Sequence, residues 1–145
     1  MKLAIIYGSE TGNSEEFAEE IADHYGVEAT EGNEFDIAKL PEVQNIIVVV
    51  GTAGDGEYPS NFDEFAESLE EEKPDLSKSK FAVFGLGSTS YDAFCEAAKK
   101  IQKVLKDLGA SPLAVKSDNF GDDEDDDGYK TKGEPWFEEL KTVLA

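Results

Sequence analysis

The sequence predicts an α/β fold in which helices cover both faces of a parallel sheet. Apolar runs of strand length alternate with segments of helical periodicity, and this alternation is typical of an open parallel sheet. The run NIIVVV, residues 45–50, is apolar at nearly every position, as expected of a strand buried on both faces. A chain of 145 residues can bury roughly two-thirds of its unfolded surface. We therefore expect a single domain over residues 1–145.

The first half of the chain is expected to hold three strands and one helix. Residues 2–7 form an apolar strand, the polar residues 27–30 suit the sheet edge, and residues 45–50 suit its centre. Residues 13–25 have helical spacing, and Gly26 ends this helix. Its inner stripe comprises Phe17, Ile21, Ala22 and Tyr25. The crossover between residues 30 and 45 is expected to be a loop or a short turn of helix.

The second half is expected to alternate three helices with two strands. The first helix has an N-cap signal at Ser60 or Asn61 and ends before Pro74. Its apolar face comprises Phe62, Phe65, Ala66 and Leu69. A strand at 80–86 leads to a helix at 91–108, which Gly109 closes. Residues 111–115 form the fifth strand, and residues 134–144 form the last helix, with Pro135 in its first turn.

The charge balance restricts the kinds of partner. The chain has 13 Lys and Arg residues against 33 Asp and Glu residues, a formal net charge of −20. Nucleic acid is excluded as a partner, because its binding depends on cations that displace phosphate counterions. A partner with a basic face would be attracted instead, at a rate that falls with salt. The alternative is that the charge reflects only a soluble acidic surface or adaptation to high salt.

The cellular setting is also restricted by composition. The single cysteine, Cys95, excludes an intrachain disulfide, and one histidine leaves no His/Cys cluster for zinc. The apolar runs are too short to cross a membrane, and the N-terminus lacks the features of a signal peptide. We expect a cytoplasmic monomer that has no membrane partner.

Glycine and hydroxyl residues gather after three of the expected strands. The segment GSETGNS follows the first strand, GTAGDGEYPSN the third and GLGSTSYDAF the fourth. In open parallel sheets, ligands bind outside the carboxyl ends of the strands, where the winding direction reverses. The three segments therefore predict a ligand site at one edge of the sheet.

The first of these segments has the chemistry of an anion site. Its side chains offer hydrogen-bond donors at Ser9, Thr11, Asn13 and Ser14. Gly12 lets the backbone curl, so that N–H groups converge at the positive end of the following helix. No Lys or Arg occurs between Leu3 and Ala38, so dipoles and hydroxyls would hold a phosphate without a cation. The alternative is an ordinary helix N-cap. The segment lacks the Gly-Lys-Ser/Thr ending of a nucleotide triphosphate loop and the three-glycine dinucleotide fingerprint.

The chain resembles the flavodoxin family. The resemblance rests on SETGNS, on GTAGDGEYPSN and on FGLGSTSYDAFCEAAKKIQKVLKDLGA, and it extends over essentially the whole chain. The spacing is most similar to that of short-chain flavodoxins and of the FMN domains of diflavin reductases. The resemblance implies a doubly wound five-stranded sheet of order 2-1-3-4-5 with FMN at the switch point.

The resemblance also implies which residues bind FMN. The phosphate would be held by Ser9, Glu10 through its backbone, Thr11, Gly12, Asn13 and Ser14. The isoalloxazine ring would be lined by Thr52, Ala53 and Gly54, and the Gly54 carbonyl would accept a hydrogen bond from reduced flavin N5. Gly85, Gly87 and Ser88 would run beside the pyrimidine edge, and Tyr91 would stack on the ring. The remaining expected binding residues in these loops are Asp55, Gly56, Tyr58, Leu86 and Phe94.

Two residues depart from the family pattern. Many flavodoxins have an aromatic residue where this chain has Ala53, so one flavin face is uncovered unless Tyr58 reaches it. An offset aromatic stack contributes about 0.5 to 1.5 kcal/mol beyond its buried area, so we expect weaker FMN binding. Several relatives have Asp where this chain has Ser88. Without that charge beside flavin N1, we expect a less negative final reduction step.

The function that the resemblance implies is low-potential electron transfer by FMN. The donor would be a basic-faced NADPH-dependent flavodoxin or ferredoxin reductase, and the acceptor an oxidase, radical enzyme or monooxygenase. No reductase domain is expected on this chain, which would be a separate carrier without substrate turnover of its own. The alternative is a flavodoxin-fold module that binds FMN weakly or not at all and acts by protein contact.

An aspartate-rich segment matches a calcium-loop pattern. Asp123, Asp125, Asp127, Gly128 and Glu134 have the spacing of D-x-D-x-D-G followed by Glu. A strand and SDNFGD precede the segment where an EF-hand needs a helix, and Lys130 occupies a position that is usually apolar. We expect a solvated acidic loop near the flavin rim and no metal, with a calcium site as the alternative.

Overall fold

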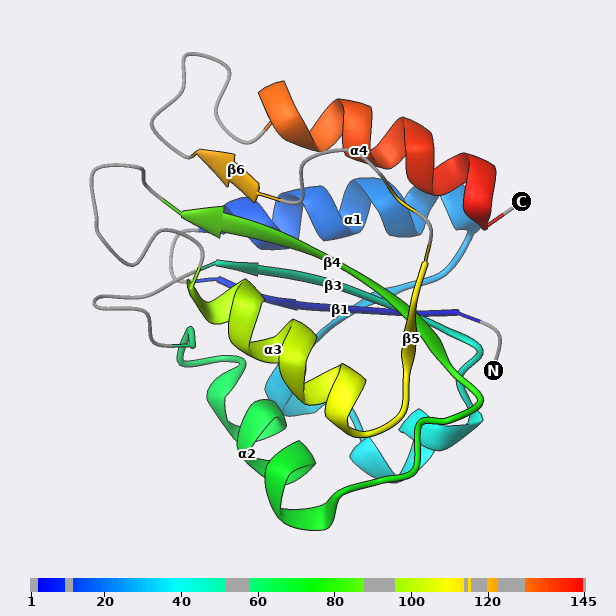
Figure 1. Cartoon of the computed structure of the whole chain (residues 1–145). Coiled ribbons are helices and arrows are strands. Elements are labelled where there is room, and N and C mark those ends of the chain that lie inside the picture. Colours follow the sequence, from blue (N-terminus) through cyan, green and yellow to red (C-terminus); the bar gives the residue numbers. More distant parts are fainter. Residues whose placement is uncertain are drawn as a thin grey trace.

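A parallel sheet lies between two layers of helices (Figure 1). The structure, a computed structural model, describes residues 3–9, 12–51, 58–87, 96–113, 115, 120–122 and 130–144. The strands are paired in the order β2-β1-β3-β4-β5, and β6 also pairs with β4. The predicted α/β class and the strand order 2-1-3-4-5 are therefore confirmed.

Strands and helices alternate along the chain up to β5, which is followed by β6 and then α4. The strands are β1 (Leu3–Gly8), β2 (Ala29–Glu31), β3 (Asn45–Gly51), β4 (Lys80–Gly87), β5 (Ser111–Pro112) and β6 (Phe120–Asp122). The α-helices are α1 (Asn13–Tyr25), α2 (Asp63–Glu72), α3 (Glu96–Asp107) and α4 (Lys130–Val143). Two short 3-10 helices, η1 (Gly32–Glu34) and η2 (Ile37–Glu42), make the crossover that was expected to be a loop or a short turn. Residues 91–95, predicted to begin the third helix, lie outside the described residues.

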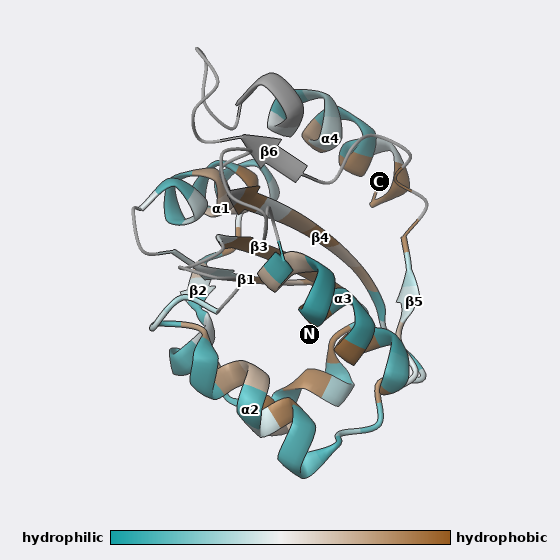
Figure 2. Ribbon diagram, turned by 60° about the vertical axis from the view of Figure 1, so that its left-hand side comes forward, coloured by the Kyte–Doolittle hydropathy of each residue, from teal (hydrophilic) through white to brown (hydrophobic). Residues whose placement is uncertain are grey.

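Two apolar cores lie on opposite faces of the sheet. Alternate residues of each central strand face opposite ways, so that Ile5 and Ile47 belong to one core and Ile6 and Val48 to the other. The first core is covered by α1 and α4, and the second by α2, α3 and η2. Figure 2 shows the apolar central strands between helices whose outer faces are hydrophilic. This two-sided burial explains the continuous apolar run in β3.

The central strands end level with one another. Gly8 at the end of β1 is opposite Val50, and Gly51 at the end of β3 is opposite Leu86 of β4. The segments that follow these strands therefore start side by side at the carboxyl ends of the strands, as predicted. Gly8 also permits a close contact, because a Cβ built on it would lie 2.4 Å from the Cβ of Phe62.

The glycine-stopped helix ends agree with the prediction, and the start of the last helix does not. Gly26 and Gly109 have φ values of 68° and 103°, the left-handed conformation expected at helix ends. The last helix, however, begins at Lys130, so Pro135 is its sixth residue and the prediction of a first-turn proline was wrong. Pro135 is exposed and has no backbone N–H, so the second turn of α4 lacks one helical hydrogen bond at this residue.

The strand that pairs with the outer side of β4 is also shorter than predicted. Residues 111–115 were predicted to form one strand, but β5 contains only Ser111 and Pro112. Pro112 has no N–H to donate to a strand ladder, and Leu113 makes the next bond, donating to the Phe81 carbonyl at 2.7 Å. A second segment, β6, then pairs with residues 85–87 of β4, and the sequence analysis did not predict it.

The N-terminus of α2 is capped from a distance. Phe62 is the N-cap residue and makes no side-chain cap, so the prediction of a cap by Ser60 or Asn61 was wrong. The Asn33 side-chain oxygen instead accepts hydrogen bonds from the N–H groups of Glu64 and Phe65, at 3.0 and 3.2 Å. The crossover thus stabilises the start of the next helix. Among the described residues, no helix has the length and apolar character needed to cross a membrane.

Candidate functional site

The turn between β1 and α1 is built around a left-handed glycine. Gly12 is the N-cap of α1 with φ 91°, a conformation that favours glycine, and among the described residues no side chain caps the helix. Its N–H donates to Ser9 Oγ at 2.8 Å, and its carbonyl accepts from the Glu16 N–H at 3.0 Å. Ser9 therefore organises the turn, while the helix begins without a Ser, Thr or Asn side chain as its cap.

Ser14, the second residue of α1, has a buried hydroxyl that lacks a hydrogen-bond partner in the described part of the chain. Its side chain is 1% exposed. A Cβ built on Gly51 would lie 3.6 Å from Ser14 Oγ and 3.8 Å from the Gly8 carbonyl oxygen, so the hydroxyl faces the ends of β1 and β3. An unsatisfied buried polar group costs about 1–3 kcal/mol. A ligand acceptor at the helix N-terminus would satisfy this hydroxyl, and an anion is favoured there.

Acidic side chains surround this turn. Glu15 and Glu16 lie in the first turn of α1, and Glu31 ends β2 opposite Tyr7. Burial, followed by the charges of Glu15 and Glu31, raises the pKa of Tyr7 to about 12. An anion held here would depend on backbone N–H groups and hydroxyls, because the sequence from Leu3 to Ala38 contains no Lys or Arg.

The end of β4 lies at the same side of the sheet as this turn, with β3 between them. Gly85 and Leu86 of β4 are opposite Val50 and Gly51 of β3, whose other neighbour is β1. Leu86 is 1% exposed, and its side chain belongs to the core under α1 and α4. Only the backbone of Leu86 is therefore available to a ligand at this edge. The structure thus places the starting residues of all three predicted segments, Gly8, Gly51 and Gly85, at the same ends of neighbouring strands.

The comparisons with known proteins agree with this geometry. The family model described as Flavodoxin matches residues 5–136. The chain is a member of the flavodoxin family. FMN is the cofactor of that family, and the Ser14 hydroxyl, which has no hydrogen-bond partner among the described residues, fits its phosphate.

Solved and curated relatives support the assignment. A flavodoxin from Pseudomonas aeruginosa, solved as a cysteine-to-serine mutant, is 27% identical, with a TM-score of 0.82 over 99% of both chains. The mitochondrial pyruvate dehydrogenase [NADP(+)] of Euglena gracilis is 38% identical over 97% of this chain and 8% of its own length. Human NADPH–cytochrome P450 reductase is 39% identical over 77% of this chain and 18% of its own length. The chain spans less than a quarter of the length of these curated relatives. Family and fold together support flavin-mediated electron transfer.

The described residues include part of the predicted flavodoxin site. Ser9, Gly12, Asn13 and Ser14 surround the start of α1, and Gly85, Leu86 and Gly87 end β4. Apart from Tyr58, the other predicted residues lie outside the described ranges, and FMN binding by each predicted residue stays a prediction. Those outside the described ranges are Glu10, Thr11, Thr52, Ala53, Gly54, Asp55, Gly56, Ser88, Tyr91 and Phe94.

Tyr58 packs towards α2 and α3. Its ring centroid lies 5.6 Å from that of Phe62, and Lys100 Nζ lies 5.8 Å from the centroid of the Tyr58 ring. Burial, with a smaller effect of Glu70, raises the pKa of Tyr58 to about 12. The described contacts of Tyr58 are thus with the helix layer, and the prediction that it contacts the flavin stays a prediction.

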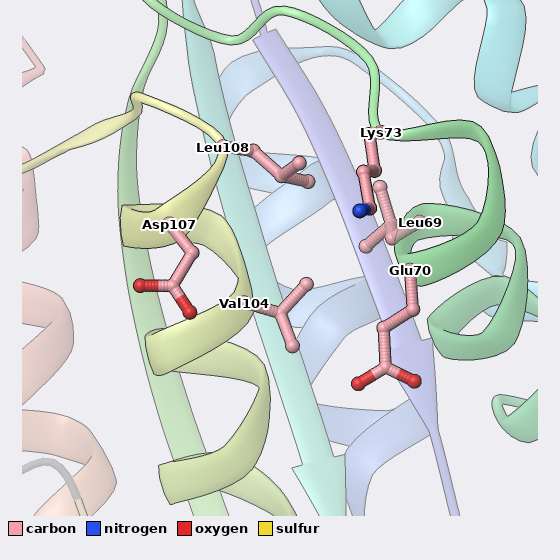
Figure 3. Close-up of a pocket in the computed structure, with 6 residues that line it drawn as sticks. All are labelled: Leu69, Glu70, Lys73, Val104, Asp107 and Leu108. Carbon is pink, nitrogen blue, oxygen red and sulfur yellow. The ribbon is translucent and has the colours of Figure 1, made fainter.

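A cavity of about 420 Å³ lies away from this flavodoxin site. It is lined by Leu69, Glu70, Lys73, Val104, Asp107 and Leu108 (Figure 3). These residues belong to the C-terminal ends of α2 and α3, which lie at the opposite edge of the sheet from the strand ends described above. The lining combines apolar Leu69, Val104 and Leu108 with charged Glu70, Lys73 and Asp107. The cavity is too far from the turn between β1 and α1 to contribute to ligand binding there.

The calcium-like segment is only partly described. Glu134 is exposed on α4, while Asp123, Asp125, Asp127 and Gly128 lie outside the described residues. In the part of the chain that the structure describes, no group of three or more His, Cys, Asp or Glu residues is placed to hold a metal ion. The calcium alternative stays untested.

Sequence analysis missed two residues that support the turn between β1 and α1. The Ser9 N–H donates to Asn61 Oδ1 at 2.9 Å, and Asn61 Nδ2 donates to Glu31 Oε1 at 3.1 Å. The local pattern favours Asn61 as a helix cap, and Glu31 is one of many acidic residues. Both contacts join segments at least 30 residues apart, so nothing in the local sequence could have identified them.

Proposed function

We propose that this chain is an FMN-dependent, low-potential electron carrier. It would take single electrons from an NADPH-dependent reductase and deliver them to an acceptor enzyme, without substrate turnover of its own. The observation that carries the proposal is the Ser14 hydroxyl, which is buried at a helix N-terminus and lacks a partner among the described residues. When bound, FMN supplies the redox chemistry, because it accepts and returns electrons one at a time.

The task of the chain is to bind and orient FMN. The phosphate would lie at the start of α1, where the positive end of the helix favours an anion and Ser14 supplies a hydroxyl donor. The acidic residues around the turn would make an additional negative charge on the flavin less favourable, which lowers the reduction potential. No side chain needs to act as an acid or base.

The described surface favours a basic partner at the cofactor edge. Exposed carboxylates lie in the first turns of both α1 and α2, at Glu15, Glu16, Asp63 and Glu64. Exposed lysines lie on α3 instead, at Lys99, Lys100, Lys103 and Lys106. We infer that a basic-faced reductase docks over the N-terminal ends of α1 and α2. The net charge of −20 favours a monomer and disfavours binding to nucleic acid. We also propose a cytoplasmic location without a membrane partner.

A visible spectrum of the purified protein tests the cofactor proposal. The spectrum is recorded before and after FMN is added and then during stepwise reduction. We expect absorbance bands that shift on binding and reduction in two resolved one-electron stages. A protein that is colourless and leaves the FMN spectrum unchanged would refute the carrier and support the alternative, a module that acts by protein contact.

Charge reversal on α2 tests the docking proposal. The E64K/E67K variant changes two exposed carboxylates in the N-terminal half of the helix, and the E71K/E72K control makes the same change at its C-terminal end. With a flavodoxin reductase as the donor, we expect slower reduction and a weaker salt dependence for E64K/E67K only. Equal rates for the two variants would contradict the proposed docking site.

A further inference from the structure

Asn61 connects two segments that are distant from it in sequence. Its Oδ1 accepts a hydrogen bond from the Ser9 N–H at 2.9 Å, and its Nδ2 donates to Glu31 Oε1 at 3.1 Å. All three residues are partly buried. We call this arrangement of Ser9, Asn61 and Glu31 the Asn61 bridge. It joins the turn before α1 to the end of the edge strand β2.

The two ends of the Asn61 bridge require a side chain that both accepts and donates. A backbone N–H such as that of Ser9 can only donate, and an ionised carboxylate such as Glu31 can only accept. A carboxamide satisfies both partners at once. Its orientation is fixed by this chemistry, because the reverse orientation would place two donors together at one end and two acceptors at the other.

The backbone of Asn61 is held in place independently of its side chain. The Asn61 carbonyl accepts from the Asn33 N–H at 3.0 Å, and Asn33 Nδ2 donates to the Ser60 carbonyl at 2.8 Å. The neighbouring Phe62 is fully buried, and it lies so close to Gly32 that a Cβ there would be 2.7 Å from its ring. The Asn61 side chain therefore extends from a fixed base towards the turn.

The geometry points to Asn61 as a positioning residue for the FMN phosphate, and we propose that Glu31 orients its amide. The bridge holds the Ser9 backbone, and Ser9 Oγ in turn accepts from the Gly12 N–H at 2.8 Å. Because the bridge fixes the conformation of this turn before FMN binds, the turn loses less conformational entropy when the phosphate binds. The inference rests on the proposed function, because it requires the phosphate to lie at the start of α1.

Glu31 allows positioning to be separated from simple charge effects. A carboxylate close to the phosphate repels it, so charge alone predicts that any neutral replacement of Glu31 strengthens FMN binding. The positioning role predicts a difference between two neutral replacements. E31Q keeps an oxygen that can accept from Asn61 Nδ2, whereas E31L removes the acceptor and leaves the amide without its orienting partner.

Paired titrations with FMN and riboflavin test the inference. Riboflavin lacks the phosphate, so loss of positioning should affect FMN alone. We expect N61L to raise the Kd for FMN about two- to tenfold and to change that for riboflavin less than about twofold. E31L should bind FMN more weakly than E31Q. The control S79A removes a buried hydroxyl at the start of β4 and should leave both affinities unchanged.

The outcomes distinguish this inference from the proposed function. If N61L weakens FMN and riboflavin equally, or if E31L and E31Q bind FMN equally well, the positioning role is refuted. If the unmodified chain binds neither flavin, or does not prefer FMN to riboflavin, the proposed phosphate site itself fails. Should N61L not fold, as judged by urea unfolding, the comparison of E31L with E31Q decides the matter alone.

Discussion

Replacing Ser14 with alanine should stabilise the flavin-free protein and weaken FMN binding. The Ser14 hydroxyl is 1% exposed and lacks a partner in the described part of the chain. Removing such a group recovers part of its burial cost of about 1–3 kcal/mol, and alanine also has the higher helix propensity. We expect S14A to raise the free energy of unfolding by about 1 kcal/mol without FMN.

The same substitution should lower the affinity for FMN. A hydrogen bond to a charged group contributes about 1.5–3 kcal/mol, so S14A should raise the Kd for FMN roughly 10- to 150-fold. Riboflavin affinity should not change, because riboflavin has no phosphate. Urea unfolding without flavin and fluorescence titration with each flavin measure the two effects separately.

Ser79 provides a matched control for Ser14. It is also 1% exposed, but its Oγ donates to the Val43 carbonyl at 2.5 Å. S79A leaves that carbonyl without this partner, so it should lower the free energy of unfolding by about 1–3 kcal/mol and leave FMN affinity unchanged. If S14A destabilises the flavin-free protein as S79A does, or binds FMN as tightly as the unmodified chain, the assignment of Ser14 to the phosphate is wrong.

Three further predictions concern packing, pH and potential. G8A should lower the free energy of unfolding by about 1–3 kcal/mol in urea, because its Cβ would lie 2.4 Å from that of Phe62; unchanged stability would contradict the close packing. In the folded protein the pKa of Tyr7 is raised from 10.0 to about 12. As the pH rises, the unfolded chain therefore loses the Tyr7 hydroxyl proton before the folded chain does. We expect the free energy of unfolding to fall between pH 10 and pH 12. Y7F should reduce that fall, and a pH profile of stability identical to that of the unmodified chain would refute the role of Tyr7. S88D should make the final reduction potential more negative in a redox titration, and an unchanged potential would rule out the expected charge effect.

The fold could be predicted where the physical cause is local. Burial on both faces produces the continuous apolar run of β3, and a left-handed helix end favours the glycine seen at Gly26 and Gly109. Where the cause is distant, prediction failed. The cap of α2 comes from Asn33 in the crossover, so the local signal at Ser60 and Asn61 was misleading.

The candidate site shows the same division between local and distant causes. The glycine and hydroxyls of SETGNS indicate an anion site because their conformational freedom and donors belong to the segment itself. Burial of the Ser14 hydroxyl depends on the ends of β1 and β3, and the contact between Ser9 and Asn61 crosses 52 residues. These features arise only when the sheet brings the segments together.

The short strands at the borders of the sheet affect how the protein behaves at high concentration. Among the described residues, β2 and β6 have three residues each and β5 has two, whereas the central strands have six to eight. An unpaired border is where a second chain can add by backbone hydrogen bonding, and a short one offers few such bonds. Together with mutual repulsion at a net charge of −20, this limits strand-to-strand aggregation between copies. Copies of this chain can thus collide often without building fibrils from their own sheets.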